Sequence, residues 1–144
     1  MINETYIRES VFSDLISIHK ISESSLKNSW SLKSFEEDFN NMFSKYFSLI
    51  YKNEVIGFLS SRIVIDEVTI TNIGILEKFR GNHLSKTLLN NLFSLYKNFN
   101  FFLEVRESNV IAISLYKSLG FLEISKRYSY YKNPTENAII MKKF

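Results

Sequence analysis

The chain has 144 residues, 45% of them hydrophobic, so it is long enough for one buried core and too apolar for a disordered segment. It contains no cysteine, which excludes disulfides, thiolate metal sites and a cysteine nucleophile. The formal charge of +3 reflects 18 Lys and Arg residues scattered along the chain, whereas a nucleic-acid-binding domain usually gathers them into a stripe.

The sequence also indicates where the protein acts and which classes of ligand it binds. No apolar run approaches the about 20 residues of a membrane span, and residues 1–4 lack the basic start and apolar core of a secretion signal. We therefore expect a soluble cytoplasmic protein whose partners include neither nucleic acid nor a membrane. His19 and His83 are not at metal-ligand spacing with any carboxylate cluster, so no metal is expected. The mild positive charge fits an anionic ligand.

The first third of the chain predicts a short strand at residues 5–8 and then two helices. Ser13-Asp14 would cap the first helix, whose apolar residues recur at helical spacing: Leu15, Ile18 and Ile21. Residues 22–30 are polar and predict a loop. A second helix would begin near Ser31 and carry one apolar side, formed by Phe35, Phe39, Met42 and Phe43.

From Tyr46 the apolar period changes to that of strands. Residues 46–51 and 55–64 predict a β-hairpin, and residues 66–75 predict a further strand. A short polar loop with Arg80 and Gly81 then leads into a helix over residues 84–96, whose stripe predicts a core face: Leu84, Leu88, Leu92, Leu95 and Tyr96. The first turn of such a helix binds phosphate oxygens, because its N–H groups lack intrahelical partners and the helix dipole adds positive potential.

A second strand–helix unit follows at residues 101–106 and 108–119, with Gly120 where a helix end benefits from backbone freedom. Its helix would turn Ile111, Leu115 and Leu119 toward the core. Two closing strands, residues 128–131 and 137–142, would be joined by a turn at Asn133-Pro134. We therefore predict an α/β (α+β) fold for residues 1–144, a single domain with a central mixed sheet of about seven strands and helices on both faces.

Three polar residues in this unit each have a structural interpretation, and Glu104 also has a functional one. Glu104 interrupts an apolar strand, so it is either a general base whose pKa is raised by partial burial or a carboxylate paired with Arg106 or Lys126. Asn109 is a good helix N-cap, and Tyr116, one turn after Ala112, is compatible with a core tyrosine that bonds a backbone group.

Eight short phrases, from residue 66 to residue 141, carry a resemblance through their order and spacing: Asp66-Glu67, Asn72-Ile73, Leu103-Glu104-Val105-Arg106, Ser108-Asn109, Leu115-Tyr116, Ser118-Leu119-Gly120-Phe121, Tyr130-Tyr131 and Ala138-Ile139-Ile140-Met141. The chain resembles the GNAT family of N-acetyltransferases and, within it, the RimI type, which acetylates the N-terminal alanine of a small-subunit ribosomal protein.

The resemblance implies acetyl-CoA as co-substrate. It would be bound by the strand Ile73-Gly74-Ile75, by Asn109, and by the loop and first helical turn, namely Arg80, Gly81, Asn82, His83, Leu84, Ser85 and Lys86. Glycines are common in the family where His83 and Ser85 stand. Ser85 is tolerable because backbone N–H groups do the binding, whereas His83 would either crowd the pyrophosphate or add a donor to it.

The resemblance also implies the chemistry. Glu104 would accept the proton of the attacking amine, Tyr116 would protonate the departing thiolate, and a backbone N–H of the 73–75 strand would stabilise the oxyanion. Tyr130 and Tyr131 would wall the acceptor groove, unless they serve strand packing.

An N-terminal amine, with an unperturbed pKa of about 8, is easier to deprotonate than a lysine at about 10.4. The amine pKa thus favours an N-terminus, and the resemblance implies that it is the alanine N-terminus of a small-subunit ribosomal protein. Another protein N-terminus, a lysine, a small amine, or a non-catalytic acyl-CoA-binding or ribosome-associated role are the alternatives, and the sequence leaves the oligomeric state open.

Overall fold

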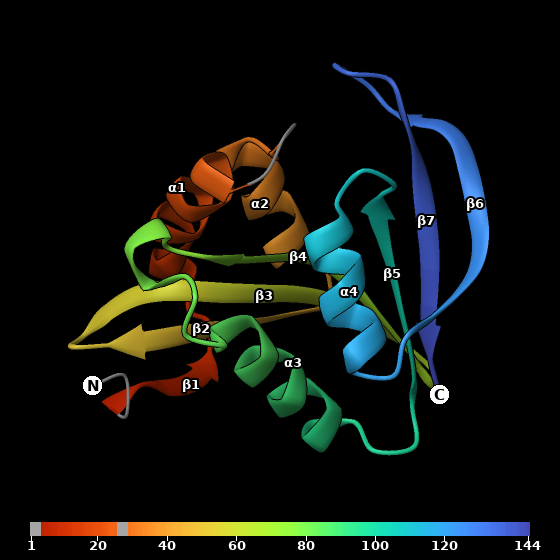
Figure 1. Cartoon of the computed structure of the whole chain (residues 1–144). Coiled ribbons are helices and arrows are strands. Elements are labelled where there is room, and N and C mark those ends of the chain that lie inside the picture. The colour runs from red at the N-terminus through yellow and green to blue at the C-terminus, as the bar shows by residue number, and fades with distance from the viewer. Residues whose placement is uncertain (1–3, 26–28) are drawn as a thin grey trace.

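In the computed structural model, which describes residues 4–25 and 29–144, seven strands form one mixed sheet (Figure 1). In spatial order they are β1 (Tyr6–Glu9), β2 (Ser44–Tyr51), β3 (Glu54–Val64), β4 (Glu67–Ile75), β5 (Asn100–Arg106), β7 (Glu136–Lys143) and β6 (Leu122–Tyr131). Neighbours are antiparallel except β4 and β5, which are parallel. The predicted mixed sheet is confirmed.

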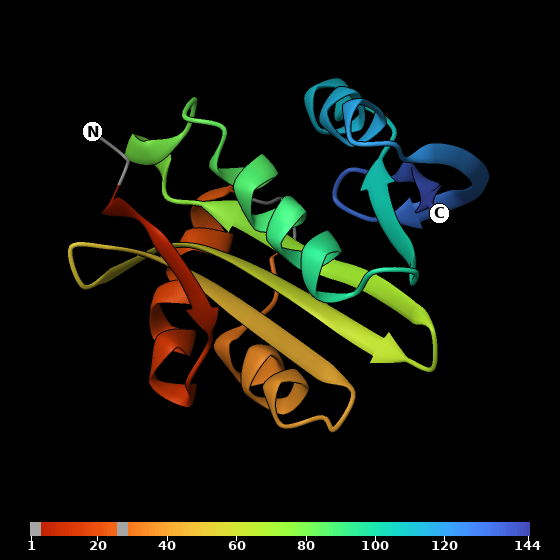
Figure 2. The ribbon, with the colours of Figure 1, turned by 90° about the horizontal axis from the view of Figure 1, so that it is seen from below.

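Helices cover both faces of the sheet, as predicted (Figure 2). On one face lie α1 (Leu15–Ser25) and α2 (Leu32–Phe39), and on the other lie α3 (Leu84–Leu95) and α4 (Val110–Ser118). The buried side chains accordingly form a cluster under α1 and α2 that includes Ile18 and Phe58, and a larger cluster under α3 and α4 that includes Leu88 and Leu103. Short 3-10 helices, η2 (Phe12–Asp14) and η3 (Glu77–Phe79), precede α1 and α3.

The strands β4 and β5 run side by side only over their first residues. Their register ends at the pair Ile70 and Leu103. A β-bulge follows in β4, where Thr71 is the extra residue between the pairs that Ile70 and Asn72 make with β3. A bulge bends its strand and increases the local twist, and beyond it β4 and β5 diverge (Figure 1). The sheet therefore opens at its centre.

Two helix boundaries differ from the sequence prediction. The loop predicted over residues 22–30 is wrong in its first part, because α1 continues to Ser25. Ser24 and Ser25 donate their hydroxyls to the Ile21 carbonyl oxygen at 2.9 and 2.7 Å, so these serines are satisfied inside the helix. Residues 26–28 of that loop lie outside the described residues.

The helix α2 ends at Phe39, earlier than predicted. Asn41 accepts the Phe43 N–H at 2.8 Å in a turn that leads into β2, and Met42 is 87% exposed. In α3 the buried face includes Leu89, while the predicted Leu95 is more than half exposed.

Two predictions for the last third also need correction. Ile111 is 83% exposed and does not face the core, although Leu115 and Leu119 pack against it as predicted. The last strand but one is longer than predicted: β6 starts at Leu122 rather than at Tyr128. Because β6 is an edge strand with nearly all its residues exposed, its sequence carries no alternating apolar signal.

A buried carboxylate ties the first strand to the sheet. Asp14 is 6% exposed and accepts from both guanidinium nitrogens of Arg8 at 2.7 and 3.0 Å, from the Val11 N–H at 2.9 Å and from the Ser48 hydroxyl at 3.0 Å. Burial alone would raise the pKa of Asp14, but these hydrogen bonds and the Arg8 charge outweigh it and hold the pKa below its usual value.

Because the folded-state pKa of Asp14 is depressed, its stabilisation is complete above the unfolded pKa of about 3.9 and is lost as the pH falls through the folded value. We expect Asp14→Asn to lower the free energy of unfolding at pH 7 by roughly 1 to 3 kcal/mol, and by less at pH 3. Urea denaturation at both pH values measures this. The exposed pair of Lys45 with Glu9 at 2.8 Å supplies the control, since Glu9→Gln should change stability by about 0.5 kcal/mol or less. Equal losses in both variants would contradict the assignment.

Candidate active site

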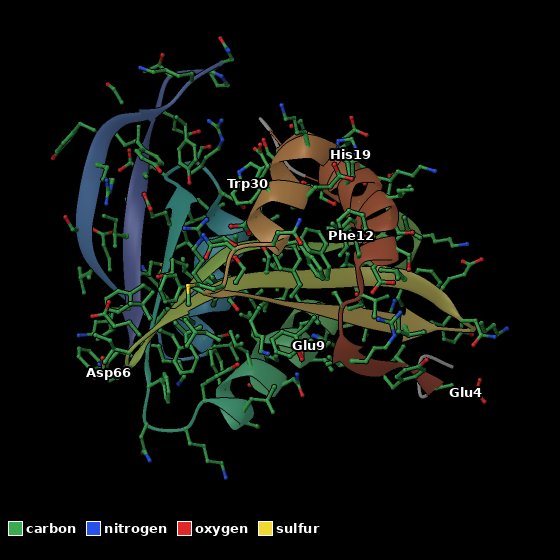
Figure 3. All side chains as sticks on the ribbon, turned by 180° about the vertical axis from the view of Figure 1, so that it is seen from behind. Glu4, Glu9, Phe12, His19, Trp30 and Asp66 are labelled. Carbon is green, nitrogen blue, oxygen red and sulfur yellow. The ribbon has the colours of Figure 1, made fainter. Side chains whose placement is uncertain are left out.

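A cleft of about 760 Å³ occupies the opening between β4 and β5. Its walls include residues from β4, β5, α4 and β6, together with Ser25 and Trp30 from the α1–α2 side; Figure 3 places Trp30 on the side of these helices toward β5. The residues predicted from the sequence that line it are Ile73, Ser85, Glu104, Asn109, Tyr116, Tyr130 and Tyr131. The other predicted residues, Gly74, Ile75, Arg80, Gly81, Asn82, His83, Leu84 and Lys86, lie outside its lining.

Side-chain alternation assigns the walls of the cleft to the two faces of the sheet. In β5, Leu103 and Val105 belong to the core under α3 and α4, so Glu104 between them points to the opposite face. In β4, a Cβ at Gly74 would meet Phe58 and Ile21, so Gly74 and, two residues earlier, Asn72 face α1 and α2. Tyr116 belongs to the α3–α4 core. The cleft is thus bordered by Glu104 on one face and by Tyr116 on the other.

The loop before α3 has the backbone geometry of an anion-binding turn. Gly81 has φ +84°, and His83, the N-cap residue, has φ 60° and ψ 25°, a left-handed conformation that histidine tolerates better than most residues. The first intrahelical bond runs from the Thr87 N–H to the His83 carbonyl oxygen at 3.1 Å, and the His83 side chain does not cap the helix. The N–H groups of the first turn are therefore available to a ligand: Leu84, Ser85 and Lys86.

Arg80 holds this loop against the rest of the site. Its Nε donates to the Ile75 carbonyl oxygen at 3.0 Å and a terminal nitrogen donates to the Ser25 hydroxyl at 2.8 Å. Asn82 stabilises the loop from within by donating its side-chain N–H to the Phe79 carbonyl oxygen at 2.9 Å. These two side chains make contacts inside the chain, so the loop's shape is set by the chain itself.

The free edge of β4 presents main-chain groups to the cleft. The Leu76 N–H donates to the Ile56 carbonyl oxygen of β3 at 2.7 Å. Because successive N–H groups of an extended chain point to opposite edges, those of Ile73 and Ile75 point away from β3, toward the edge from which β5 has diverged. The bond from Arg80 to the Ile75 carbonyl oxygen lies on this same edge.

Glu104 lies beside a cation that the sequence prediction did not name. Its side chain is 30% exposed, and its carboxylate lies 3.4 Å from Nε of Arg127 in β6. The predicted partners are wrong because both are already paired, Arg106 with Glu136 at 3.0 Å and Lys126 with Glu107 at 2.5 Å.

Tyr116 is suited to donating a proton. Its side chain is 8% exposed, and burial raises its pKa to about 12, so the phenol remains protonated at neutral pH. Within residues 4–25 and 29–144 its hydroxyl has no hydrogen-bond partner, so the alternative of a tyrosine bonded to the backbone is wrong. Asn109 does cap α4, accepting the Ala112 N–H at 3.2 Å, and a contact with CoA stays a prediction.

Tyr131 and Tyr130 form an aromatic wall, with their ring centres 5.2 Å apart. The guanidinium of Arg106 lies 4.4 Å from the Tyr131 ring centre, and Arg106 also binds Glu136 and the carbonyl oxygens of Lys132 and Pro134 at 3.3 Å. Burial and then the nearby Glu104 carboxylate raise the pKa of Tyr131 to about 12. Arg106 thus fixes both the ring and the β6–β7 turn.

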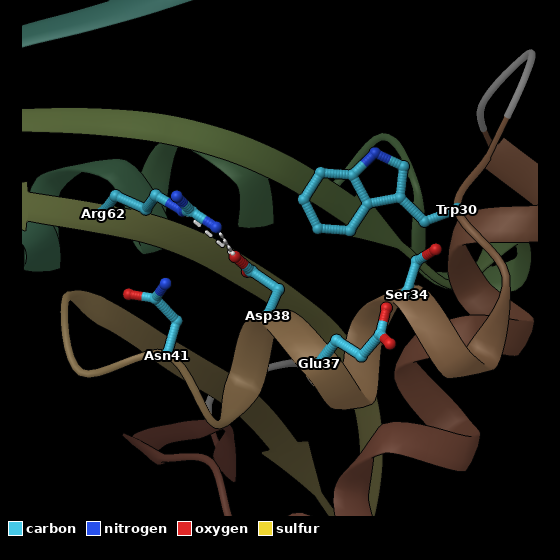
Figure 4. A pocket seen from close by; sticks show the side chains of 6 residues that line it. All are labelled: Trp30, Ser34, Glu37, Asp38, Asn41 and Arg62. Atoms are coloured by element: carbon cyan, nitrogen blue, oxygen red, sulfur yellow. Dashed lines mark hydrogen bonds and ion pairs between the residues drawn. The ribbon is translucent and has the colours of Figure 1, made fainter.

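A second hollow, of about 410 Å³, lies beside α2 and shares only Trp30 with the cleft (Figure 4). Its buried carboxylate, Asp38, accepts from Arg62 at 2.6 Å and from the Tyr46 hydroxyl at 2.7 Å. Asp38 is therefore fully engaged in holding the fold together.

No helix of residues 4–25 and 29–144 combines the length and apolar character needed to cross a membrane. In the same part of the chain, no three or more His, Asp or Glu side chains gather as a metal site would require.

Comparison with known proteins settles the family. The family model of the GNAT acetyltransferases matches residues 15–121. The chain belongs to the GNAT family. Over 110 residues it is 40% identical to the ribosomal protein bS18-alanine N-acetyltransferase of Haemophilus influenzae, covering 71% of this chain and 75% of that protein.

A second relative, the enzyme of the same name from Escherichia coli, is 33% identical over 135 residues, 89% of each chain. The crystal structure of the Escherichia coli ribosomal-protein-S18-alanine N-acetyltransferase superimposes with a TM-score of 0.90 at 30% identity, covering 96% of this chain and 92% of that one. This GNAT chain is therefore an N-acetyltransferase of the same fold.

Sequence reasoning missed three residues that line the GNAT cleft, Ser25, Trp30 and Asn72, and also Arg127, which pairs with Glu104. Asn72 could have been noticed by the argument used for Glu104, since it is a polar residue next to Ile73 in a predicted strand. Arg127 and Trp30 are distant in sequence from β4 and β5, and nothing in their neighbourhood signals the contact.

We expect Arg106→Ala to loosen the β6–β7 turn, because it removes the ion pair with Glu136 and the contact with the Tyr131 ring. Hydrogen exchange followed by mass spectrometry should show amides of residues 131–137 exchanging at least about tenfold faster, with β1 to β3 unaffected. Lys126→Ala, which removes the more exposed pair with Glu107, is the control and should leave that segment protected. Unchanged protection in Arg106→Ala would refute the role of this side chain.

Proposed function

We propose that this protein transfers the acetyl group of acetyl-CoA to the N-terminal α-amino group of a ribosomal protein that begins with alanine. The observation that carries the proposal is the cleft between β4 and β5, which is bordered by a carboxylate on one face and a protonated phenol on the other. Relatives that cover most of the chain are named for this reaction, which supports the acceptor.

The first turn of α3 fits a diphosphate. The N–H groups of Leu84, Ser85 and Lys86 lack intrahelical partners, and the helix dipole adds positive potential there. Ser85 lines the cleft, so a ligand bound at this turn can extend along the α3–α4 face toward Tyr116. That direction leaves the α1–α2 face, with Glu104 and the tyrosine wall, to the amine.

The residues of the cleft account for each proton and charge in a direct transfer. The amine, which has lost one proton to solvent, forms the new bond from its nitrogen to the carbonyl carbon, and Glu104 takes the second proton that this nitrogen loses. The N–H groups of Ile73 and Ile75 stabilise the negative charge on the carbonyl oxygen. As the carbon–sulfur bond breaks, Tyr116 donates its phenolic proton to the thiolate, and the tyrosinate regains a proton from solvent as Glu104 releases the one that it took. No covalent intermediate on the enzyme is required.

The α-amino group suits this arrangement better than a lysine does. Its unperturbed pKa of about 8 means that a substantial fraction is deprotonated near neutral pH, whereas a lysine at about 10.4 would need a stronger base. Glu104 is partly exposed and lies beside Arg127. Tyr130 and Tyr131 enclose the side where the first residue would lie, which favours a small side chain such as alanine.

The test is incubation with acetyl-CoA and short peptides that begin with Ala, Ser, Gly or Met and contain an internal lysine, with the acetylated position read by mass spectrometry. We expect acetyl on the N-terminal amine, most rapidly for Ala. Acetyl on internal lysines alone would refute the proposal.

The same assay applied to variants separates an enzyme from a binding module. Glu104→Gln and Tyr116→Phe should each lower kcat by about 10²- to 10⁴-fold and leave the Kd for acetyl-CoA within about threefold of the original, because each removes a proton-transfer group. Turnover unaffected by both changes would rule out their assigned roles.

His83 supplies an independent test of how the diphosphate is bound. Since its side chain is exposed and its backbone already has the left-handed conformation that glycine would adopt, we expect His83→Gly to leave the Kd for acetyl-CoA within about threefold, measured by calorimetry. Ser85→Pro, which removes a first-turn N–H, should weaken binding by about tenfold. A large loss in His83→Gly alone would show that the imidazole, and not the main chain, binds the phosphates.

A further inference from the structure

Asn72 is the one side chain in the β4 wall of the cleft with a buried polar atom that lacks a partner. Its Nδ2 is buried and has no hydrogen-bond partner within residues 4–25 and 29–144. Polar neighbours in the same wall are satisfied: Thr71 bonds Ser60 at 2.7 Å, and Ser25 bonds the Ile21 carbonyl oxygen at 2.7 Å. A buried donor without a partner is costly, so the carboxamide calls for a partner from outside the chain.

The position of Asn72 shows which substrate could supply that partner. Asn72 follows the bulge of β4 and points to the α1–α2 face, as Glu104 does from β5. The unpaired Nδ2 of Asn72 is a donor and the carbonyl oxygen of a peptide group is an acceptor, which makes the two complementary. The side of the cleft with the proposed base therefore also carries a group suited to a peptide bond.

We propose that Asn72 binds the first peptide group of the acceptor and thereby selects a protein N-terminus over a lysine side chain. This inference rests on the proposed function. The N-terminal amine and the first peptide carbonyl are attached to the same carbon, so both reach the cleft together. A lysine amine stands at the end of a four-carbon stem, and its own peptide groups lie too far away to reach Asn72.

The test compares two acceptors: a peptide that begins with alanine, and the same peptide with a blocked N-terminus and one internal lysine. In Asn72→Leu we expect kcat/KM for the alanine N-terminus to fall about tenfold, chiefly through KM, because the hydrogen bond to the first peptide carbonyl is lost. Activity on the lysine peptide should stay within about threefold. Thr69→Val replaces a hydroxyl by a methyl group of similar size in the same wall. It should leave the ratio of kcat/KM for the two acceptors unchanged.

A second measurement changes the acceptor as well as the enzyme. Replacing the first peptide bond of the acceptor by an ester makes its carbonyl oxygen a weaker hydrogen-bond acceptor for the Asn72 Nδ2. We expect the ester to lower kcat/KM about fivefold for the unmodified enzyme and to cause no further loss in Asn72→Leu. If Asn72→Leu is poorly folded, as judged by thermal melting and acetyl-CoA binding, Asn72→Asp, which keeps the shape and loses the donor, replaces it.

The outcomes distinguish a failure of the role of Asn72 from a failure of the proposed function. Equal losses on both acceptors, or an ester effect that persists in Asn72→Leu, would overturn the role of Asn72 while the proposed function stands. An unmodified enzyme that acetylates no N-terminus would overturn both. A selective loss on the N-terminal acceptor supports both.

Discussion

The parallel pairing of β4 with β5 ends at Ile70 and Leu103, and the candidate site depends on this separation. A strand pair that continued would fill the space with side chains and use the edge of β4 for its own hydrogen bonds. Because the pair opens after the Thr71 bulge, β4 keeps main-chain N–H groups directed at the cleft. The opening also connects the two faces of the sheet, so two ligands can approach one point from opposite sides.

Much of this arrangement could be predicted from the sequence. The change from helical to strand period at Tyr46 indicated the hairpin, and the scarce glycines marked Gly81 and Gly120, both of which have positive φ. The order of strand, polar loop and helix located the first turn of α3. These are local features, and local physical chemistry determines them.

What the sequence did not reveal depends on contacts between distant segments. The partner of Glu104 is Arg127 because the nearer candidates are already paired: Arg106 with Glu136 of β7, and Lys126 with Glu107, which follows β5. Ile111 has the spacing of a core residue and is exposed, since α4 borders the cleft and leaves that flank uncovered. The edge strand β6 has few buried residues, so its sequence lacks the alternating apolar pattern from which its length could be predicted.

The most direct test of the account is a crystal structure with acetyl-CoA bound. The account predicts the diphosphate at the N–H groups of Leu84, Ser85 and Lys86, and the acetyl carbonyl within hydrogen-bond distance of the Ile73 or Ile75 N–H, reached from the α3–α4 face. Acetyl-CoA bound on the α1–α2 face, or with its diphosphate remote from α3, would contradict it.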